Sequence, residues 1–236
     1  MSNETLADVR DMYMAHTMFR REFGLAPALI RSVADGDLGR AAVVADHLRI
    51  VDSGLHHHHA AEDKHLWPRL LERSGAGVEP VVHIVRVMEE QHDGVDELLD
   101  ELRTGLTQWR GSADAAQGEA LADTAEQLAG LLGKHLTAEE ELALPLIAKH
   151  VTAAEWGAMI ADSAGDVAPE QMPLIFGMMA YEADADVVRD IIAQMPPEVS
   201  SIIGDLAAQA FGAHAQLVYG TATPERIGAS GKKVSR

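Results

Sequence analysis

Apolar positions recur at three- and four-residue intervals along nearly the whole chain, and no stretch alternates apolar and polar residues between turn signals. This spacing is typical of amphipathic α-helices rather than half-buried strands. Four long helices are predicted, over about residues 5–34, 38–73, 80–109 and 119–149. Gly24 and Pro27 mark a candidate break in the first. The short connections favour an all-α fold, an antiparallel up-down four-helix bundle.

The pattern changes after residue 150. Thr152 and Glu155 have the spacing of a capping box that opens a new helix. The segments beyond it are shorter and are interrupted by glycines and prolines. We therefore expect a bundle over residues 1–150, an extension of three or four short helices packed on it over 151–222, and a flexible tail over 223–236.

Composition excludes several classes of protein. With 19 Lys and Arg against 37 Asp and Glu, the net charge of −18 argues against nucleic-acid binding. No apolar run approaches the roughly 18 residues of a membrane span, and no signal-peptide core follows Met1, so a cytoplasmic protein is expected. The absence of Cys excludes thiolate metal sites. Twelve His remain, so any metal site must combine imidazoles and carboxylates.

An internal repeat carries the candidate chemistry. Each half contains a His followed four residues later by Glu, a Pro six residues after that Glu, and an earlier partner His at a separation of 42 or 43 residues. The repeated set is His16, His58, Glu62 and Pro68 in the first half and His92, His135, Glu139 and Pro145 in the second.

Residues four apart lie on one face of a helix, and in a bundle that face points inward. The repeat would therefore bring four imidazoles and two carboxylates to one buried point. Such a set can hold two metal ions, each with two His, bridged by Glu62 and Glu139. Imidazole and carboxylate together suit Fe, Mn or Zn. An oxide or hydroxide bridge would leave about one open position on each ion.

This pattern, together with Glu62-Asp63-x-x-x-Trp67-Pro68, resembles the bacterial hemerythrin-like proteins with a His-His-Glu (HHE) cation-binding domain, of the type found in actinobacteria. The resemblance covers about residues 8–150. It implies a non-haem di-iron centre in a four-helix bundle, with two Fe ions held by the six repeated residues. Small diatomic or peroxide ligands are the implied partners, and we expect a monomer or homodimer.

The chain departs from the oxygen-carrying hemerythrins at one ligand. Those proteins have a fifth His one turn before the helix-three ligand, where this chain has Met88. An additional open coordination position is therefore expected, which favours an oxidoreductase acting on peroxide or nitric oxide. Reversible dioxygen binding or sensing is the alternative, and iron storage is the third.

Other residues near the repeat were weighed as further ligands. Within the run of His56 to His59 we favour His58, since His59 is expected to turn toward Asp63. His65, Tyr13, Met88 and His47 are candidates for an extra ligand or for a position behind the ligands. The interpretation of His47 and Tyr13 as ordinary core residues competes with this.

Overall fold

The computed structural model describes residues 5–73, 79–165 and 167–227, and every named element in these ranges is a helix. The first part of the chain forms α1 (Arg10–Arg31), α2 (Leu38–His65), α3 (Trp67–Arg73), α4 (Glu79–Trp109), α5 (Ala115–Ala138), the π-helical turn η1 (Glu139–Ala143) and α6 (Leu144–His150). The second part forms α7 (Ala153–Ser163), α8 (Met172–Glu182), α9 (Ala185–Gln194), α10 (Pro197–Ser200) and α11 (Ile203–Tyr219).

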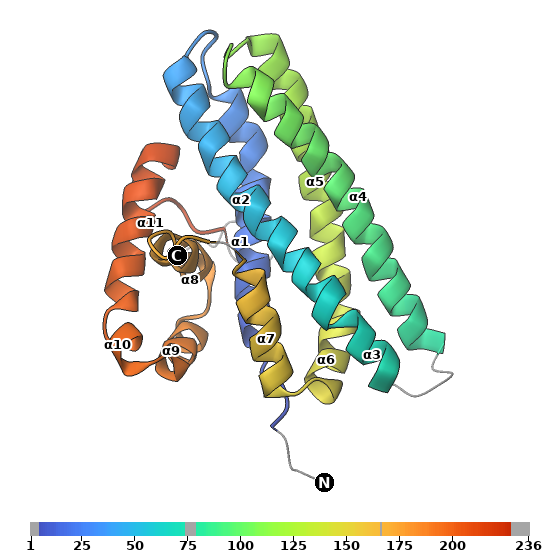
Figure 1. Cartoon of the computed structure of the whole chain (residues 1–236). Helices are drawn as coiled ribbons and strands as arrows, with labels where there is room; N and C mark the ends of the chain where they lie inside the picture. The colour runs from blue at the N-terminus through green and yellow to red at the C-terminus, as the bar shows by residue number, and fades with distance from the viewer. Residues whose placement is uncertain (1–4, 74–78, 166, 228–236) are drawn as a thin grey trace.

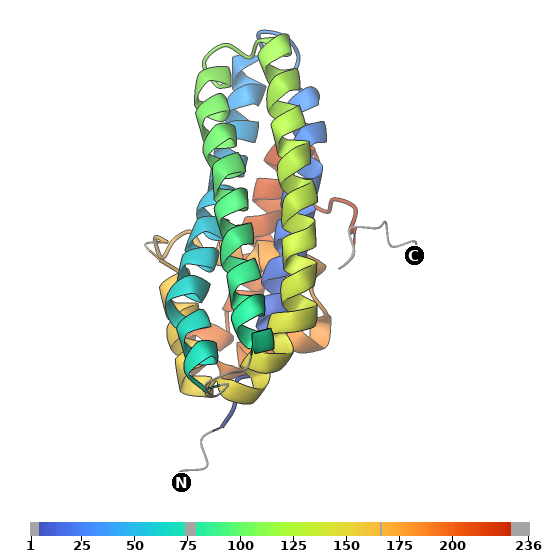
Figure 2. The same ribbon diagram turned by 90° about the vertical axis from the view of Figure 1, so that its right-hand side faces the viewer.

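Helices α1, α2, α4 and α5 lie side by side as a long bundle, and the later helices pack against one side of it (Figures 1 and 2). The all-α four-helix bundle is thus confirmed. Two predicted boundaries agree closely with the structure, because α2 begins at Leu38 and α4 ends at Trp109. Asp37 caps α2 by accepting a hydrogen bond from the backbone N–H of Arg40.

The first helix differs from its prediction in where it begins and in its lack of a break. It begins at Arg10 rather than near Thr5, because the preceding residues pair with the start of the extension: the N–H of Ala7 donates to the carbonyl of Val151 at 3.0 Å. It also continues through Gly24 and Pro27 without a break. Pro27 removes one backbone hydrogen bond, but it is buried in the bundle, where packing maintains the helix.

Each repeated Pro interrupts its helix where the sequence predicted continuity. Pro68 has no N–H and its ring clashes with the carbonyl four residues earlier, so α2 ends at His65 and α3 starts anew at Trp67. Pro145 acts in the same way near the end of the bundle, where the wider turn η1 separates α5 from α6. Both interruptions lie close to a Glu of the repeat, since α2 ends three residues after Glu62 and η1 begins at Glu139.

The extension forms five helices, one of them a single turn, rather than three or four. Thr152 and Glu155 form the predicted capping box at the start of α7. Helices α8 and α11 pack closely at Gly177, where a Cβ would lie 2.4 Å from the carbonyl oxygen of Ala207. Residues from α8 and α11 also belong to the same hydrophobic core as the bundle: Met178, Phe211, Ala215 and Val218.

Two predicted segments extend beyond the described residues. Most of the connection expected between the second and third predicted helices, residues 74–78, lies outside them, as does the tail from 228 onward. The part of the tail that is described contacts α8, since the N–H of Ile227 donates to Glu182 at 3.1 Å and Arg226 donates to the carbonyl of Ala183 at 3.1 Å. No helix in the described ranges is long and apolar enough to cross a membrane.

A buried ionic cluster joins the extension to the bundle. The guanidinium of Arg21 donates to Glu22 at 2.8 Å and to Glu182 of α8 at 3.0 Å. The other carboxylate oxygen of Glu22 lies 3.2 Å from Nε2 of His47 and accepts a hydrogen bond from the hydroxyl of Tyr219 on α11. This cluster therefore joins α1 and α2 to two helices of the extension.

The partners of Glu22 decide its charge state. Burial alone would raise the pKa of the Glu22 carboxyl, but the hydrogen bond and charge of His47 and the charge of Arg21 bring that pKa below its usual 4.5. Glu22 is therefore a buried carboxylate anion at neutral pH. Burial and the charge of Glu22 raise the pKa of Tyr219, which keeps its hydroxyl protonated as a donor.

Glu22→Gln should lower the free energy of unfolding by about 3 kcal/mol near pH 7, because Arg21 loses a buried counter-charge. The pKa of Glu22 is lower in the folded than in the unfolded chain, so its stabilisation is complete above about pH 4.5 and declines as the pH falls below that value. Urea unfolding at several pH values should show parent and variant converging in acid. Glu101→Gln, at an exposed position, is the control, and a pH-independent difference would contradict this account.

Candidate metal centre

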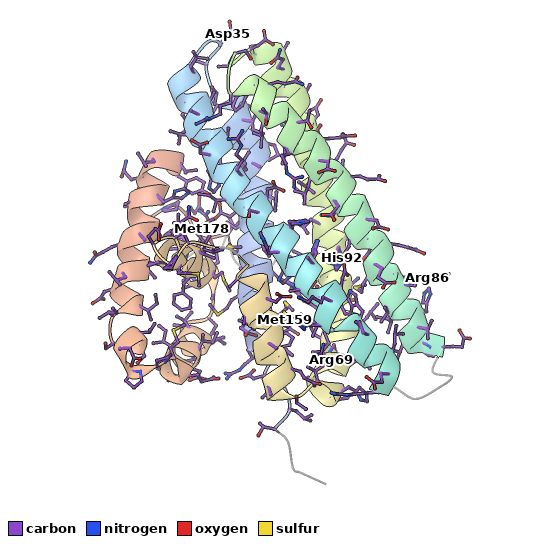
Figure 3. All side chains as sticks on the ribbon, in the orientation of Figure 1. Asp35, Arg69, Arg86, His92, Met159 and Met178 are labelled. Atoms are coloured by element: carbon purple, nitrogen blue, oxygen red, sulfur yellow. The ribbon has the colours of Figure 1, made fainter. Side chains whose placement is uncertain are left out.

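The six residues of the repeat converge in the bundle interior, and all six are buried. Figure 3 labels one of them, His92 on α4. Four imidazole-to-carboxylate distances describe the cluster. Nε2 of His58 lies 3.1 Å from Glu62, Nε2 of His92 lies 3.5 Å from Glu62, and Nε2 of His16 and of His135 lie 3.3 and 3.7 Å from Glu139. The predicted clustering is observed.

The donor atoms form two overlapping groups. Within each group, one ligand atom per residue lies within 4.8 Å of all the others. One group contains His16, His58, Glu62 and Glu139, and the other contains His59, Glu62, His92 and His135. Glu62 is shared, so the two groups are adjacent.

His59 is a member that the sequence analysis missed. Its ring stacks on that of His92, with centroids 4.0 Å apart, and it is not turned toward Asp63. Successive residues on a helix differ by about 100°, which still lets both His58 and His59 face an interior bounded by α1, α4 and α5. The cluster thus contains five imidazoles, and the fifth comes from His59 rather than from the position of Met88.

Residues behind the cluster orient three of the rings. Nδ1 of His92 lies 2.8 Å from Asp63, Nδ1 of His16 lies 2.9 Å from Glu140, and Nδ1 of His135 lies 3.2 Å from Gln91. Such contacts favour the tautomer with the proton on Nδ1, which leaves the lone pair of Nε2 directed into the cluster. Asp63 and Glu140 are held in turn by Trp67 and Arg20.

The inner donor atoms have no hydrogen-bond partners. In the described ranges, twelve buried side-chain nitrogen and oxygen atoms lack one, and ten of them belong to His16, His58, His59, Glu62, His92, His135 and Glu139. Leaving so many polar atoms unpaired in an apolar interior is costly. Imidazole nitrogens and carboxylate oxygens are metal ligands, so a bound cation would satisfy them together. The residues therefore fit a metal centre.

Burial keeps His58, His59 and His135 neutral, which is the form that binds a metal. For His16, burial acts in the same direction, but the charges and hydrogen bonds of Glu139 and Glu140 outweigh it and raise the pKa. Desolvation, with a smaller effect of neighbouring imidazoles, lowers the pKa of His58 to about 3, and desolvation likewise lowers that of His135 to about 4. Burial and the negative charge of Glu139 raise the pKa of Glu62 well above its usual range. Two carboxylates this close and this deeply buried repel each other unless positive charge lies between them.

The other candidate residues lie outside both donor groups. Nε2 of His65 contacts Asp162 at 2.8 Å, on the side facing α7. Tyr13 is 42% exposed, Met88 is buried in the apolar core, and His47 belongs to the ionic cluster around Glu22. The π-helical turn that begins at Glu139 was also missed, and Pro145 was its only signal in the sequence.

The fold and the cluster define a helical-bundle protein with a cation-binding centre. Residues 7–154 match the family model described as the hemerythrin HHE cation binding domain. The chain belongs to that family. Searches of curated proteins and of solved structures find no match.

Metal removal should destabilise the protein, since binding to the folded state adds about 2.7 kcal/mol when free metal exceeds its Kd a hundredfold. For a chain of this length we expect the melting temperature to fall by roughly 5–10 °C. Differential scanning calorimetry before and after chelation, with metal restored as the control, measures this. Identical melting temperatures would show that the buried donors do not bind the metal.

Proposed function

We propose that the protein is a non-haem di-iron protein that binds small oxygen- or nitrogen-containing ligands such as dioxygen, nitric oxide or peroxide. The observation that supports this most is the pair of adjacent donor groups that share Glu62 and consist entirely of imidazoles and carboxylates. Such mixed donors suit iron, and two groups suit two ions. Iron in this setting supplies redox-active positions that small ligands can occupy.

The two donor groups differ in their mix of imidazoles and carboxylates. One combines Glu62 with the three imidazoles of His59, His92 and His135, and the other combines Glu62 and Glu139 with the two imidazoles of His16 and His58. Each group offers four residues, so an ion in either group would keep positions for an external ligand. Phe19 lies against His58, with ring centroids 5.2 Å apart, and limits the access of water there.

The fifth imidazole in the cluster favours reversible ligand binding over peroxide turnover. The expectation of turnover rested on open positions at both ions, created by a missing fifth His. His59 supplies that fifth imidazole, so the expectation loses its basis. An oxidoreductase acting on peroxide or nitric oxide remains the competing function, and steady-state consumption of peroxide by the iron-loaded protein would distinguish it. Dioxygen binding with negligible peroxide turnover is the result we expect.

Iron content tests the centre itself. Purified parent protein should contain about two iron ions per chain. Glu62→Gln should lose most of this iron, because Glu62 belongs to both donor groups. Glu101→Gln is the control, the same change at an exposed Glu outside the cluster, and it should keep its iron. Plasma emission spectrometry gives the ratio, and a Glu62→Gln protein with full iron content would refute the assignment.

The role of His59 can be tested within its own histidine run. His59→Ala should lose part of the iron or bind it more weakly, since one donor group falls from three imidazoles to two. His56→Ala removes an exposed imidazole three residues away and should retain the parent iron content and absorption spectrum. Equal iron content in the two variants would show that His59 is not a metal ligand, and it would favour the peroxide function again.

A further inference from the structure

A cavity of about 500 Å³ lies between the bundle and the extension. One wall comes from α1 and α2 and the other from α7, α8 and the segment that joins them, with Met195 after α9 at the edge. The volume falls within the range of sites that bind small molecules. It is not one of the metal donor groups, although His58 contributes to both.

The lining of this cavity is apolar and adaptable. Seven of the ten methionines of the chain line it, among them Met14 of α1, Met159 of α7 and Met179 of α8. Figure 3 labels Met159. Methionine side chains are flexible and polarizable, and they accommodate ligands of irregular shape. An apolar cavity of this kind gives water few hydrogen-bond partners, so an apolar occupant is favoured over a cluster of waters.

Three of the charged or ionisable side chains at the cavity, Asp11, His57 and Arg49, have partners within the protein. Asp11 accepts a hydrogen bond from the indole of Trp156 at 3.2 Å, and Nδ1 of His57 donates to the carbonyl of Ser53 at 2.7 Å. The guanidinium of Arg49 is 40% exposed and lies 3.7 Å from Asp46. With a net charge of −18 on the chain, no strong attraction for an anionic head group results. The occupant should therefore be neutral.

One wall is fixed by a turn that only glycine suits. Gly165 has a φ of +53°, and a Cβ there would lie 2.5 Å from Cδ2 of His57. The chain leaving α7 is thus brought directly against α2, which closes the cavity on that side. On the opposite side the cavity reaches His58 beside Phe19, at the edge of the metal centre.

We propose that this cavity is a binding site for a neutral aliphatic molecule, of the class of medium-chain alcohols and alkanes. The chain of the ligand lies among the methionines, and one end reaches His58. The site goes beyond the proposed function, because the helices that form it do not need iron to recognise an apolar chain.

Isothermal titration calorimetry of the full chain with 1-decanol tests the proposal. We expect saturable binding with a negative heat-capacity change, the mark of apolar surface burial, and much weaker binding of 1-propanol. Ile175→Trp places a large ring in the cavity and should weaken decanol binding roughly tenfold or more. Leu217→Trp makes the same kind of change at a position that is 65% exposed, outside the cavity, and should leave binding unchanged.

A second variant guards against misfolding of the first. Ala15→Met adds a flexible chain to the cavity from a residue that suits a helix, and it should also weaken binding. Absence of saturable decanol binding to the parent protein would overturn the proposal. So would equal binding to all variants, which would place the alcohol elsewhere. Sedimentation velocity covers the remaining case: if the cavity variants change the oligomeric state instead, a second copy of the chain is the occupant and the proposal fails.

Discussion

Glu62 and Glu139 are two carboxylates buried in the same apolar interior. The free energy of hydration that they lose there is the main constraint on the residues around them. Neither carboxylate oxygen pair finds a hydrogen-bond donor among the described residues, and the surrounding Nε2 atoms have no partners either. A buried anion is stable only when positive charge or strong donors compensate for lost hydration. A metal ion bound by these residues would therefore stabilise the folded chain.

The interrupted helices lie next to the same two carboxylates. In each half of the bundle an interruption occurs near a Glu of the repeat, because α2 ends three residues after Glu62 and η1 begins at Glu139. A π-helical turn adds a residue to the helix and changes the direction in which neighbouring side chains point, and such turns occur often at functional sites. Each half thus has a Pro six residues after its Glu, Pro68 in the first and Pro145 in the second. Only the second half contains a π-helical turn.

Much of this was predictable from one sequence because the chemistry occurs twice. A single His-x-x-x-Glu would be weak evidence, but a second copy with matching Pro and partner His identified six buried residues correctly as neighbours. His59 could not be found in this way, since it has no counterpart in the second half, where Leu136 follows His135. Whether one or two adjacent helix positions face the interior depends on where neighbouring helices lie, which the sequence of one helix does not specify.

The ionic cluster was beyond prediction for a different reason. His47 was expected either near the metal ligands or as an ordinary core residue, and its ionic partners were not foreseen, because its contact on α11 lies more than 160 residues further along the chain. No local pattern signals a contact of that length. The cavity between bundle and extension is invisible for the same reason, since methionines at helical spacing are equally suited to a solid core.

Shared packing between α8, α11 and the bundle has a consequence for any shortened form of this chain. The family match ends at residue 154, yet Met178 and Phe211 belong to the same hydrophobic core as the matched part. A fragment that stopped at residue 154 would expose the apolar side chains of α1 and α2 that these residues cover, and exposed apolar patches promote association. The end of the family match is therefore not a place where the chain can be divided without uncovering its core.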